Sequence, residues 1–463
     1  MKRRDFLAGS AAAAGLALAG CDSAAPPPAR KRGDPIRWRN WSGYQSCLPA
    51  QRIAPESLDQ LVDLLRKAPG PVRPVGAGHS FTPLVPTDGT LLSLRNFTGL
   101  LRHDAKAMTA TFGAGTKLGQ VGGPLQGIGQ ALPNMPDVDE QSLAGAIGTG
   151  THGTGATLGA MHSYVTALQL VTPRGEVLEC SAAKHREIFD AARVSLGSLG
   201  VITEVTLQNL PTHNLKRRLW LEPLDALLER FDALAAKHHS FEIYLIPHCD
   251  SGIAITIDPT DEPVHPRGVD QDNNAVLDMK TLRDFTSWAP SLRRWLMNRA
   301  TADFQPEEAV DVWYKVFPSS RAVRFNEMEY HLPREHLVPT VRRVREAVEK
   351  MHPEIFFPIE VRIVKGAGDD ALLSPFHGHA TSGSIAVHHY YPEDPLPYFG
   401  TIEPLYQNLG DFGGRPHWGK MHTLSKAQLA QRYPRFQEFL DIRATLDPEG
   451  RMLNAHLKTL FGA

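Results

Sequence analysis

The stretch Val72-Arg73-Pro74-Val75-Gly76-Ala77-Gly78-His79-Ser80 decides the fold, because a short strand runs directly into a glycine turn that ends in a histidine. A second strand candidate, Met108 to Phe112, leads in the same way into Gly113-Ala114-Gly115. Glycine has no Cβ and adopts positive φ cheaply, so backbone N–H groups in such loops can approach a phosphate closely. The pattern predicts a site for a large anionic cofactor.

Two further glycine-rich stretches follow. One runs from Ser142 to Gly155, and the other, Gly197-Ser198-Leu199-Gly200-Val201-Ile202, turns into a strand. Each loop alone is weak evidence, because glycine turns between strands are usually only turns. No Gly-x-Gly-x-x-Gly opens a helix after the first strand, so a Rossmann-type NAD site is poorly supported.

The local patterns between these loops predict a mixed fold. Ser57-Leu58-Asp59-Gln60 has the spacing of a capping box and predicts a helix to Lys67. Gly 39 and Pro 36 disfavour an all-α protein. Further expected elements are strands at Thr90–Leu94, Val165–Thr172 and Val177–Cys180, with a turn at Pro173-Arg174-Gly175 and a weak helix from Leu118 to Leu125.

Length and charge bound the class of protein. At 463 residues the chain is about three times the commonest domain size, so two domains are expected. Hydrophobic residues are 42% and charged residues 21%, as in folded soluble proteins. A formal net charge of -1 gives no basic surface for nucleic acid, so nucleic-acid binding is not expected.

Residues 1–33 are expected to be a targeting segment and linker. Lys2-Arg3-Arg4 precedes an apolar run from Phe6 to Gly20, which is short for a membrane span and resembles a twin-arginine export signal. Leu18-Ala19-Gly20-Cys21 resembles a lipobox, so we expect a lipid on Cys21, a periplasmic or cell-surface location and membrane contact through that lipid only. The alternative is an ordinary cleaved signal with a chance cysteine.

Cysteines and histidines point to no metal site. Cys47, Cys180 and Cys249 are odd in number and widely spaced, so neither a disulfide framework nor a zinc motif follows. The 20 histidines include no His-Glu-x-x-His, and no metal is expected.

Trp288, Trp295 and Trp313 are expected in the core or at a domain interface. The stretch from Asp258 to Asp272 is expected to be a solvated loop bordering the site entrance.

In combination, the four glycine stretches resemble the FAD-binding domain of the vanillyl-alcohol-oxidase superfamily over residues 37 to 210. The resemblance implies an α+β fold, with FAD held between two subdomains in residues 34–211, and a histidine bonded to the flavin 8α-methyl carbon. His79 matches that histidine; the alternative is a noncovalent flavin contact or a plain loop histidine. The implied cofactor-binding residues are Gly76, Ala77, Gly78, His79, Ser80, Ser142, Gly145, Gly148, Thr149, Thr151, His152, Gly153, Gly200 and Ile202.

The second half is similar to the C-terminal domain of sugar-1,4-lactone oxidases and alditol oxidases. The motifs that carry this resemblance are Met328-Glu329-Tyr330, Phe357-Pro358-Ile359-Glu360-Val361-Arg362, Ile385-Ala386-Val387-His388 and, most specifically, His417-Trp418-Gly419-Lys420. It implies an α+β substrate-binding cap domain over residues 212–463. It also implies that Glu360, Arg362, His388 and Lys420 line the flavin face, with Ser142 beside N5. Gly366-Ala367-Gly368 and Phe376 to Ala380 match no family role.

The chemistry of these residue types supports an oxidoreductase site in the second half independently of the resemblance. Glu360 and Arg362 alternate along an expected strand and so project to one face, where burial is expensive unless the pair serves a polar ligand. Oxidation of a carbinol removes the hydroxyl proton and a hydride, and cations such as Arg362 and Lys420 favour an alkoxide-like transition state. A structural ion pair between strands is the alternative.

The expected function is therefore FAD-dependent oxidation of a CH-OH group of a sugar-1,4-lactone of the L-gulono or D-arabinono type, with oxygen as acceptor. Alternatives of the same fold are an alditol oxidase, or a dehydrogenase that passes electrons to a quinone or cytochrome. An enzyme from a branch acting on amines or phenols is less consistent with Glu360, Arg362 and Lys420. The non-enzyme alternative is an exported lipoprotein that binds carbohydrate without turnover.

Overall fold

The computed structural model describes residues 36–391, 393–410 and 413–463. The chain divides into two units, Met1–Ile36 and Arg37–Ala463, and the account below concerns the second. The predicted export signal, the lipid on Cys21 and the linker lie outside the described residues. Within the described ranges, no helix combines the length and the apolar character needed to cross a membrane.

The capping box predicts the first helix correctly. α2, Leu58–Lys67, starts where the Ser57 hydroxyl accepts a hydrogen bond from Gln60 N at 3.3 Å. Leu61 and Leu65 on one face of the helix are buried in the main core. A small parallel sheet follows in the order β3-β5-β4, whose strands are Gln51–Ile53, Thr90–Ser93 and Val72–Val75.

A five-stranded antiparallel sheet completes the first half. Its order is β10-β9-β11-β7-β6, with bounds Val177–Ser181, Val165–Val171, Val201–Gln208, Thr109–Gly113 and Leu100–Asp104. β9 and β10 form the expected hairpin, in which Gly175 has φ +76 and Thr172 N donates to Glu176 O at 2.9 Å. The predicted strands are confirmed, with ends shifted by at most one residue.

The glycine-rich stretch after Ser142 differs from expectation, because it opens with helix α4, Leu143–Thr149, rather than with a loop. Small side chains let this helix approach the turn after β7 closely: Ala144 N donates to Ala114 O at 2.9 Å and Leu143 N to Thr116 O at 2.8 Å. The weak helix expected near Leu118 forms as a 3₁₀ turn, Leu118–Gln120, followed by α3, Gly122–Gly127.

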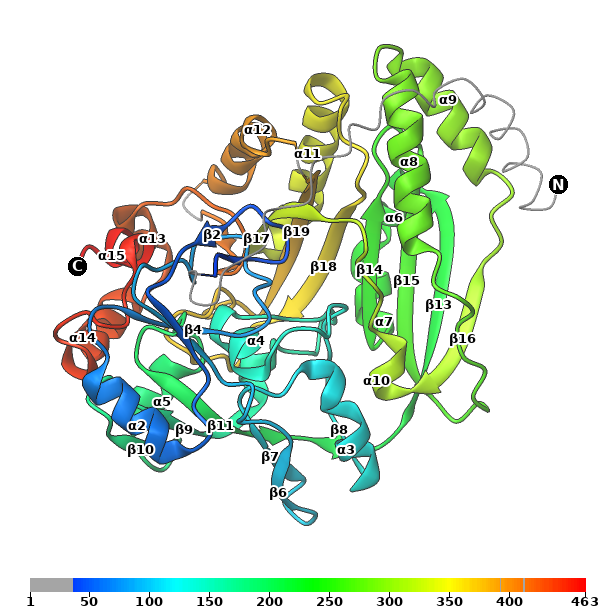
Figure 1. Cartoon of the computed structure of the whole chain (residues 1–463). Helices are drawn as coiled ribbons and strands as arrows, with labels where there is room; N and C mark the ends of the chain where they lie inside the picture. The colour runs from blue at the N-terminus through cyan, green and yellow to red at the C-terminus, as the bar shows by residue number, and fades with distance from the viewer. Residues whose placement is uncertain (1–35, 392, 411–412) are drawn as a thin grey trace. The chain divides into compact units, whose positions relative to one another are not determined.

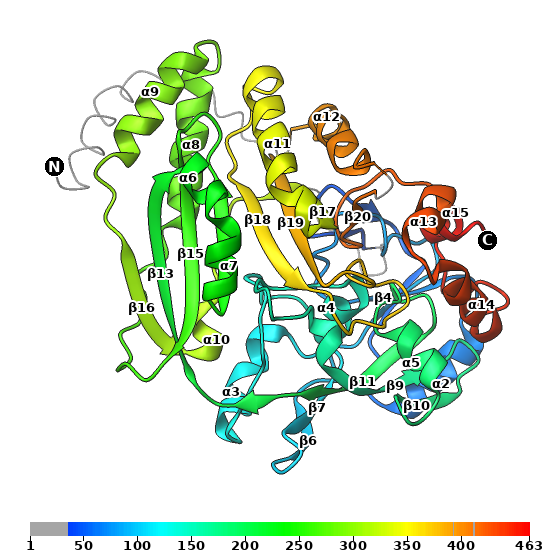
Figure 2. The ribbon, with the colours of Figure 1, turned by 180° about the vertical axis from the view of Figure 1, so that it is seen from behind.

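The second half is built on one eight-stranded antiparallel sheet. Its order is β16-β13-β15-β14-β18-β19-β17-β20, with bounds Glu307–Val312, Asn214–Pro223, Ser251–Thr260, Ser240–Leu245, Ile359–Lys365, Thr381–Tyr390, Phe325–Pro333 and Arg415–Pro416. Helices pack on the sheet and are seen in front of it in Figure 2; they are α6 (Leu224–Glu229), α7 (Phe231–Lys237), α11 (Leu337–Met351) and α12 (Leu396–Gln407). The α+β fold expected from the sequence is confirmed.

The last helices return to the first half, and Figure 1 shows one of them, α14, near α2. They are α13 (Lys426–Arg432), α14 (Phe436–Leu446), which packs on α5 (Arg186–Ala192), and α15 (Ala455–Phe461). Val72 N donates to Arg451 O at 2.8 Å. The buried Arg73 guanidinium donates to the carbonyls of Leu84, Leu196, Gly197 and Met452. The strand that enters the glycine turn is thus held by the end of the chain.

A helical hairpin, α8 (Asp272–Thr286) and α9 (Pro290–Thr301), projects beyond the eight-stranded sheet (Figures 1 and 2). It contains two of the three tryptophans expected to be buried. Trp313, the first residue of α10 (Trp313–Val316), is 1% exposed, as expected. The prediction is wrong for Trp288 and Trp295, which are 80% and 62% exposed, because no described element packs over them.

Short pairings connect these parts. β1 (Trp38–Arg39) pairs with β2 (Ser46–Cys47), and β8 (Gln130–Ala131) with β12 (Leu210–Pro211).

Cys47, Cys180 and Cys249 are free thiols. The stretch from Asp258 is strand up to Thr260 and only then becomes an exposed loop, whose Arg267 reaches the second cavity described below.

Candidate active site

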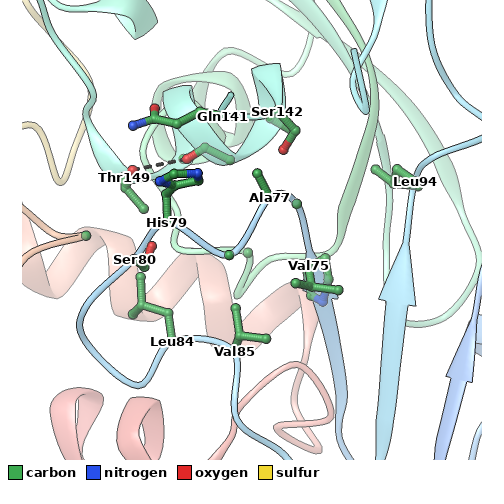
Figure 3. A pocket seen from close by; sticks show the side chains of 18 of the residues that line it. Val75, Ala77, His79, Ser80, Leu84, Val85, Leu94, Gln141, Ser142 and Thr149 are labelled. Atoms are coloured by element: carbon green, nitrogen blue, oxygen red, sulfur yellow. Dashed lines mark hydrogen bonds between the residues drawn. The ribbon is translucent and has the colours of Figure 1, made fainter. Parts of the chain in front are cut away.

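The turn from Gly76 to Ser80 lies against the start of α4. A Cβ at Gly76 would lie 2.1 Å from Ser142 Oγ, so a larger residue there would displace the Ser142 side chain. The Gly78 carbonyl accepts a hydrogen bond from Trp41 N at 2.8 Å, and the His79 ring stacks on Trp41 with centroids 5.4 Å apart. Figure 3 shows the His79 side chain pointing into the pocket between Ala77 and Thr149. The backbone therefore fixes where this imidazole points.

A first cavity follows this turn and the face of α4. Of the predicted cofactor-binding residues it is lined by Gly76, Ala77, Gly78, His79, Ser80, Ser142, Gly145, Gly148, Thr149, Thr151, Gly200 and Ile202. His152 and Gly153 line a second cavity instead. The fold thus brings the four glycine stretches together around one space, as the cofactor prediction requires.

The lining of the first cavity suits an anionic cofactor. Its charged side chains are Arg73, Arg95, Lys117 and Lys420, and no carboxylate lies among the described residues that line it. Gly200 has φ +146, and a Cβ there would lie 2.4 Å from Val171 O, so the backbone itself forms the wall. Such a cradle of main chain and cations fits the pyrophosphate and ring system of FAD.

His79 is uncharged in this position. Burial, followed by the positive charge of Lys420, lowers its pKa from 6.5 to about 4. A neutral imidazole keeps the lone pair that a bond to an electrophilic carbon needs. Phe81 N donates to Gly419 O at 2.7 Å, which ties the His79 turn to the His-Trp-Gly-Lys motif.

The second cavity lies over the eight-stranded sheet and is lined by charged groups. Four residues line both cavities, namely Gln141, Thr151, His417 and Lys420, so the two spaces meet there. Glu360, Arg362 and His388 line only the second cavity. All four predicted catalytic residues therefore surround the space that begins where the cofactor cavity ends.

Strand register explains this cluster. Side chains two residues apart share a face of a strand, and directly opposite residues of neighbouring strands are in contact range. Arg362 of β18 lies opposite Glu242 of β14, and Glu360 lies opposite Tyr244. His388 of β19 lies opposite Glu327 of β17. Alternating polar residues on four strands thus meet on one face.

Arg362 is buried among carboxylates. Its Nε donates to Glu242 Oε2 at 2.7 Å, its Nη2 pairs with Glu360, and Asp137 Oδ2 lies 3.6 Å from Nη2. Burial alone would lower the pKa of Arg362, but Glu360, Glu242 and Asp137 raise it well above its usual value. Tyr244 OH donates to Glu360 Oε1 at 2.5 Å. Burial, against the pull of Arg362, raises the pKa of Glu360 to about 8. The Glu360-Arg362 contact joins two side chains of one strand, and both side chains also line the second cavity.

Lys420 and His388 share Glu327. Lys420 Nζ forms an ion pair with Glu327 Oε2, and His388 Nε2 lies 3.7 Å from Glu327 Oε1. Burial opposes the charge on Lys420, but Glu327 and Glu329 raise its pKa above the usual value, so it is a cation. Burial lowers the pKa of His388. Its Nδ1 lies 3.2 Å from the Pro358 carbonyl, which can only accept, so Nε2 carries the lone pair.

Among the residues that the structure describes, two groups of side chains lie close enough to share a metal ion. They are His152, Glu329 and His331, and Glu327, Glu360 and His388. His152 Nδ1 and Nε2 lie 2.7 and 2.8 Å from Gly153 O and Glu329 Oε1, and both are acceptors. Both ring nitrogens of His152 are therefore already engaged by protein atoms. The carboxylates of the second group are engaged by Lys420, Arg362 and Tyr244. In the first group only His152 and Glu329 are paired, whereas neither ring nitrogen of the buried His331 has a hydrogen-bond partner.

The sequence left several cavity residues unassigned. Glu242 and Tyr244 alternate on β14 as Glu360 and Arg362 do on β18, and that period-two pattern was a usable signal. Asp137 lies in a loop without regular periodicity, and it pairs with Arg321 from across the cavity. Nothing local in the sequence indicates that contact.

Comparison with known proteins matches both halves. The D-arabinono-1,4-lactone oxidase family matches residues 205–460, and an FAD binding domain matches residues 49–181. L-gulono-1,4-lactone dehydrogenase of Mycobacterium tuberculosis is 37% identical over 92% of this chain and 99% of its own. L-gulonolactone oxidase of Bos taurus is 30% identical over 92% and 98%. Alditol oxidase of a Streptomyces species is 29% identical over 91% and 98%.

A solved structure shows the same fold. Cholesterol oxidase from Brevibacterium sterolicum superposes with a TM-score of 0.74 over 94% of this chain and 99% of that one, at 16% identity. With its full-length relatives, the matched domains and the cavity built for FAD, the chain belongs to the D-arabinono-1,4-lactone oxidase family and is an FAD-dependent oxidoreductase.

Proposed function

We propose that the chain oxidises a CH-OH group of a sugar-1,4-lactone of the L-gulono or D-arabinono type, with oxygen as the final acceptor. The observation that carries this proposal is the meeting of the two cavities at Gln141, Thr151, His417 and Lys420. One side is a carboxylate-free cradle for FAD, and the other is a charged cavity that suits a ligand rich in hydroxyl groups. The relatives named for lactone oxidation support the same substrate class.

Bound in the first cavity, FAD would supply a hydride acceptor at N5. The residues around the second cavity bind and orient the substrate. His388 Nε2 has a free lone pair at neutral pH and is the group best placed to accept the hydroxyl proton. Arg362 and Lys420 are cations that stabilise negative charge developing on the substrate oxygen.

Two alternatives of the same chemistry have a specific observation in their favour. One relative is named an alditol oxidase, whose substrate is an open-chain polyol. The 37% identical relative is named a dehydrogenase rather than an oxidase. A quinone or cytochrome is therefore the alternative acceptor, and an alditol the alternative substrate.

A substrate and acceptor panel tests the proposal. Purified protein should bleach from yellow on addition of a sugar-1,4-lactone, and turnover with oxygen should exceed turnover with an artificial acceptor under anaerobic conditions. Turnover only with the artificial acceptor would establish the dehydrogenase. Bleaching by alditols but by no lactone would overturn the substrate class.

We further propose that FAD is bonded covalently through His79, because this neutral imidazole points into the cofactor cavity. Acid precipitation should leave the yellow colour in the pellet of the parent protein, whereas His79→Ala should release it into the supernatant. His103→Ala, on the exposed strand β6, is the matched control and should keep the colour in the pellet. Freely extracted flavin in the parent protein would refute the covalent bond but not FAD binding.

Lys420 is expected to act on the chemical step. Lys420→Met should lower kcat by about 10²–10³, as for loss of one charge-stabilising group. The same change leaves the buried Glu327 carboxylate without its ion-pair partner, so the free energy of unfolding should also fall by about 3–5 kcal/mol. The double variant Lys420→Met/Glu327→Gln removes that buried charge, and it should recover thermal stability and flavin content but not the rate of flavin reduction.

Stopped-flow flavin reduction and thermal melts separate the two effects. Glu327→Gln alone is the control for the second substitution. A double variant that reduces flavin at the parent rate would mean that Lys420 only neutralises Glu327. A double variant that cannot hold flavin would make Lys420 a structural residue.

The proposed location is the periplasm or cell surface, reached by a twin-arginine route and maintained by lipid on Cys21. The support is the sequence alone: Arg3-Arg4 before a short apolar run, and Leu18 to Cys21 at its end. Mass spectrometry of the exported protein should find a diacylglycerol on an N-terminal Cys21, and Cys21→Ser should release the protein from membranes. An exported product that begins elsewhere and carries no lipid would disprove the anchor.

A further inference from the structure

The second cavity follows most of the width of the eight-stranded sheet. Its lining runs from Glu327 on β17, beside Lys420, to Arg217 on β13. In the strand order β17-β19-β18-β14-β15-β13 these two ends are five steps apart, which is about 24 Å at the usual spacing of neighbouring strands (Figure 1). A single lactone ring with its side chain covers only part of that length, so the cavity has room for a longer ligand.

Arg217 forms the far end of this cavity. In the sheet register Arg217 lies opposite Ile257 of β15, and Ile257 lies opposite Ser240 of β14. All three residues line the cavity, so the Arg217 side chain projects from the same face of the sheet as the catalytic cluster. Arg217 is only 9% exposed.

Arg217 is also the charged side chain of this lining that has no partner. Every other Asp, Glu, Lys or Arg of the lining is paired with a described residue, in the sets Arg267–Asp272, Arg321–Asp137, Arg362 with Glu242 and Glu360, Lys420–Glu327, and Glu329–His152. The described part of the chain offers the Arg217 guanidinium neither a hydrogen bond nor an ion pair.

The surroundings of Arg217 do not compensate for this. Burial, followed by the positive charge of Arg267, lowers the pKa of Arg217, while the charges of Glu242 and Asp272 act in the opposite direction. Those two carboxylates are already engaged by Arg362 and Arg267 at 2.7 Å each. A buried cation without a counter-charge is costly, so a cavity that keeps one is suited to a ligand that supplies the negative charge.

The floor between Arg217 and the catalytic cluster is apolar. It is formed by side chains of β13 and β15, namely Leu219, Ile253, Ile255 and Ile257. Such a floor forms no hydrogen bonds, but it can pack against the C–H face of a sugar ring. The cavity thus has a charged catalytic end, an apolar middle and a cationic far end.

We infer that the second cavity binds a sugar derivative with a carboxylate remote from the carbon that is oxidised, and that Arg217 binds this carboxylate. The inference deepens the proposed function and rests on it. A guanidinium pairs with a planar carboxylate through two parallel N–H···O bonds. One unpaired cation balances one negative charge, which favours a carboxylate over a phosphate dianion.

Strand spacing indicates where on the ligand the carboxylate lies. β13 is three strand steps, about 14 Å, from β18, which carries Glu360 and Arg362. The carboxylate therefore belongs to a second sugar unit, linked to the one that faces the flavin cavity. The ligand class is an acidic disaccharide or longer chain that ends in a lactone or an alditol.

The test compares two disaccharide alditols that differ only in charge. They are cellobiitol and its uronic counterpart, in which glucuronic acid replaces the glucose unit, and neither hydrolyses as a lactone does. In titration calorimetry the flavin-loaded parent protein should bind the uronic compound at least about tenfold more tightly. Arg217→Met should abolish this preference, and Arg217→Lys should keep part of it, because lysine retains the charge but not the two-bond geometry.

The matched control is the neighbouring arginine of the same strand. Arg218 points to the opposite face of β13, its side chain is 54% exposed, and Arg218→Met should show the parent preference. Thermal melts add a readout of structural roles. Arg217→Met removes an unpaired buried charge, so its melting temperature should not fall below that of the parent.

Equal affinity of the parent protein for the two alditols would overturn the inference, and so would an Arg217→Met variant that keeps the preference. Calorimetry needs no turnover, so this result is separate from the proposed function. A protein that oxidises lactones but binds both alditols equally keeps the proposed function and loses the carboxylate site. A protein that prefers the uronic compound through Arg217, but whose flavin is bleached by no lactone or alditol, keeps the site and loses the proposed function.

Discussion

Arg362 is buried between Glu242, Glu360 and Asp137, and this arrangement constrains the molecule around it. A guanidinium and three carboxylates are expensive to remove from water unless each finds a partner in good geometry. Two of the carboxylates come from neighbouring strands, so β14 and β18 must keep their register. The third comes from the other half of the chain, so the loop at Asp137 must lie over the sheet.

The same constraint joins the two halves. Asp137 binds Arg321 as well as Arg362, and its backbone carbonyl accepts from Ser319 N at 3.1 Å. Gly155 N donates to Ile363 O at 2.7 Å, one residue beyond Arg362 on β18. The two halves of the chain therefore meet at β18, the strand that carries Glu360 and Arg362, and this contact brings the first cavity next to the second.

Local pattern explains what could be predicted from the sequence. A capping box, period-two strands and glycine turns report short-range geometry and predicted the elements, whereas the family resemblance singled out His79 and, together with strand alternation, Arg362. Asp137 and the Glu327 partner of Lys420 depend on contacts across many residues, for which no local signal exists. The prediction for Trp288 is wrong for another reason: it rested on the aromatic type of the residue, and residue type alone does not show whether another element packs over the side chain.

The strand that precedes the glycine turn of the first cavity, and the loop after that turn, are held by hydrogen bonds to residues 451–454. Val72 bonds to Arg451, Arg73 to Met452, and Asn454 Nδ2 donates to the carbonyls of Pro83 and Pro86 at 2.8 Å. A ribosome makes these residues about 380 positions after the strand they hold. The flavin cradle therefore cannot close until synthesis has passed residue 454, and FAD-binding residues made early in synthesis have to wait for partners made much later.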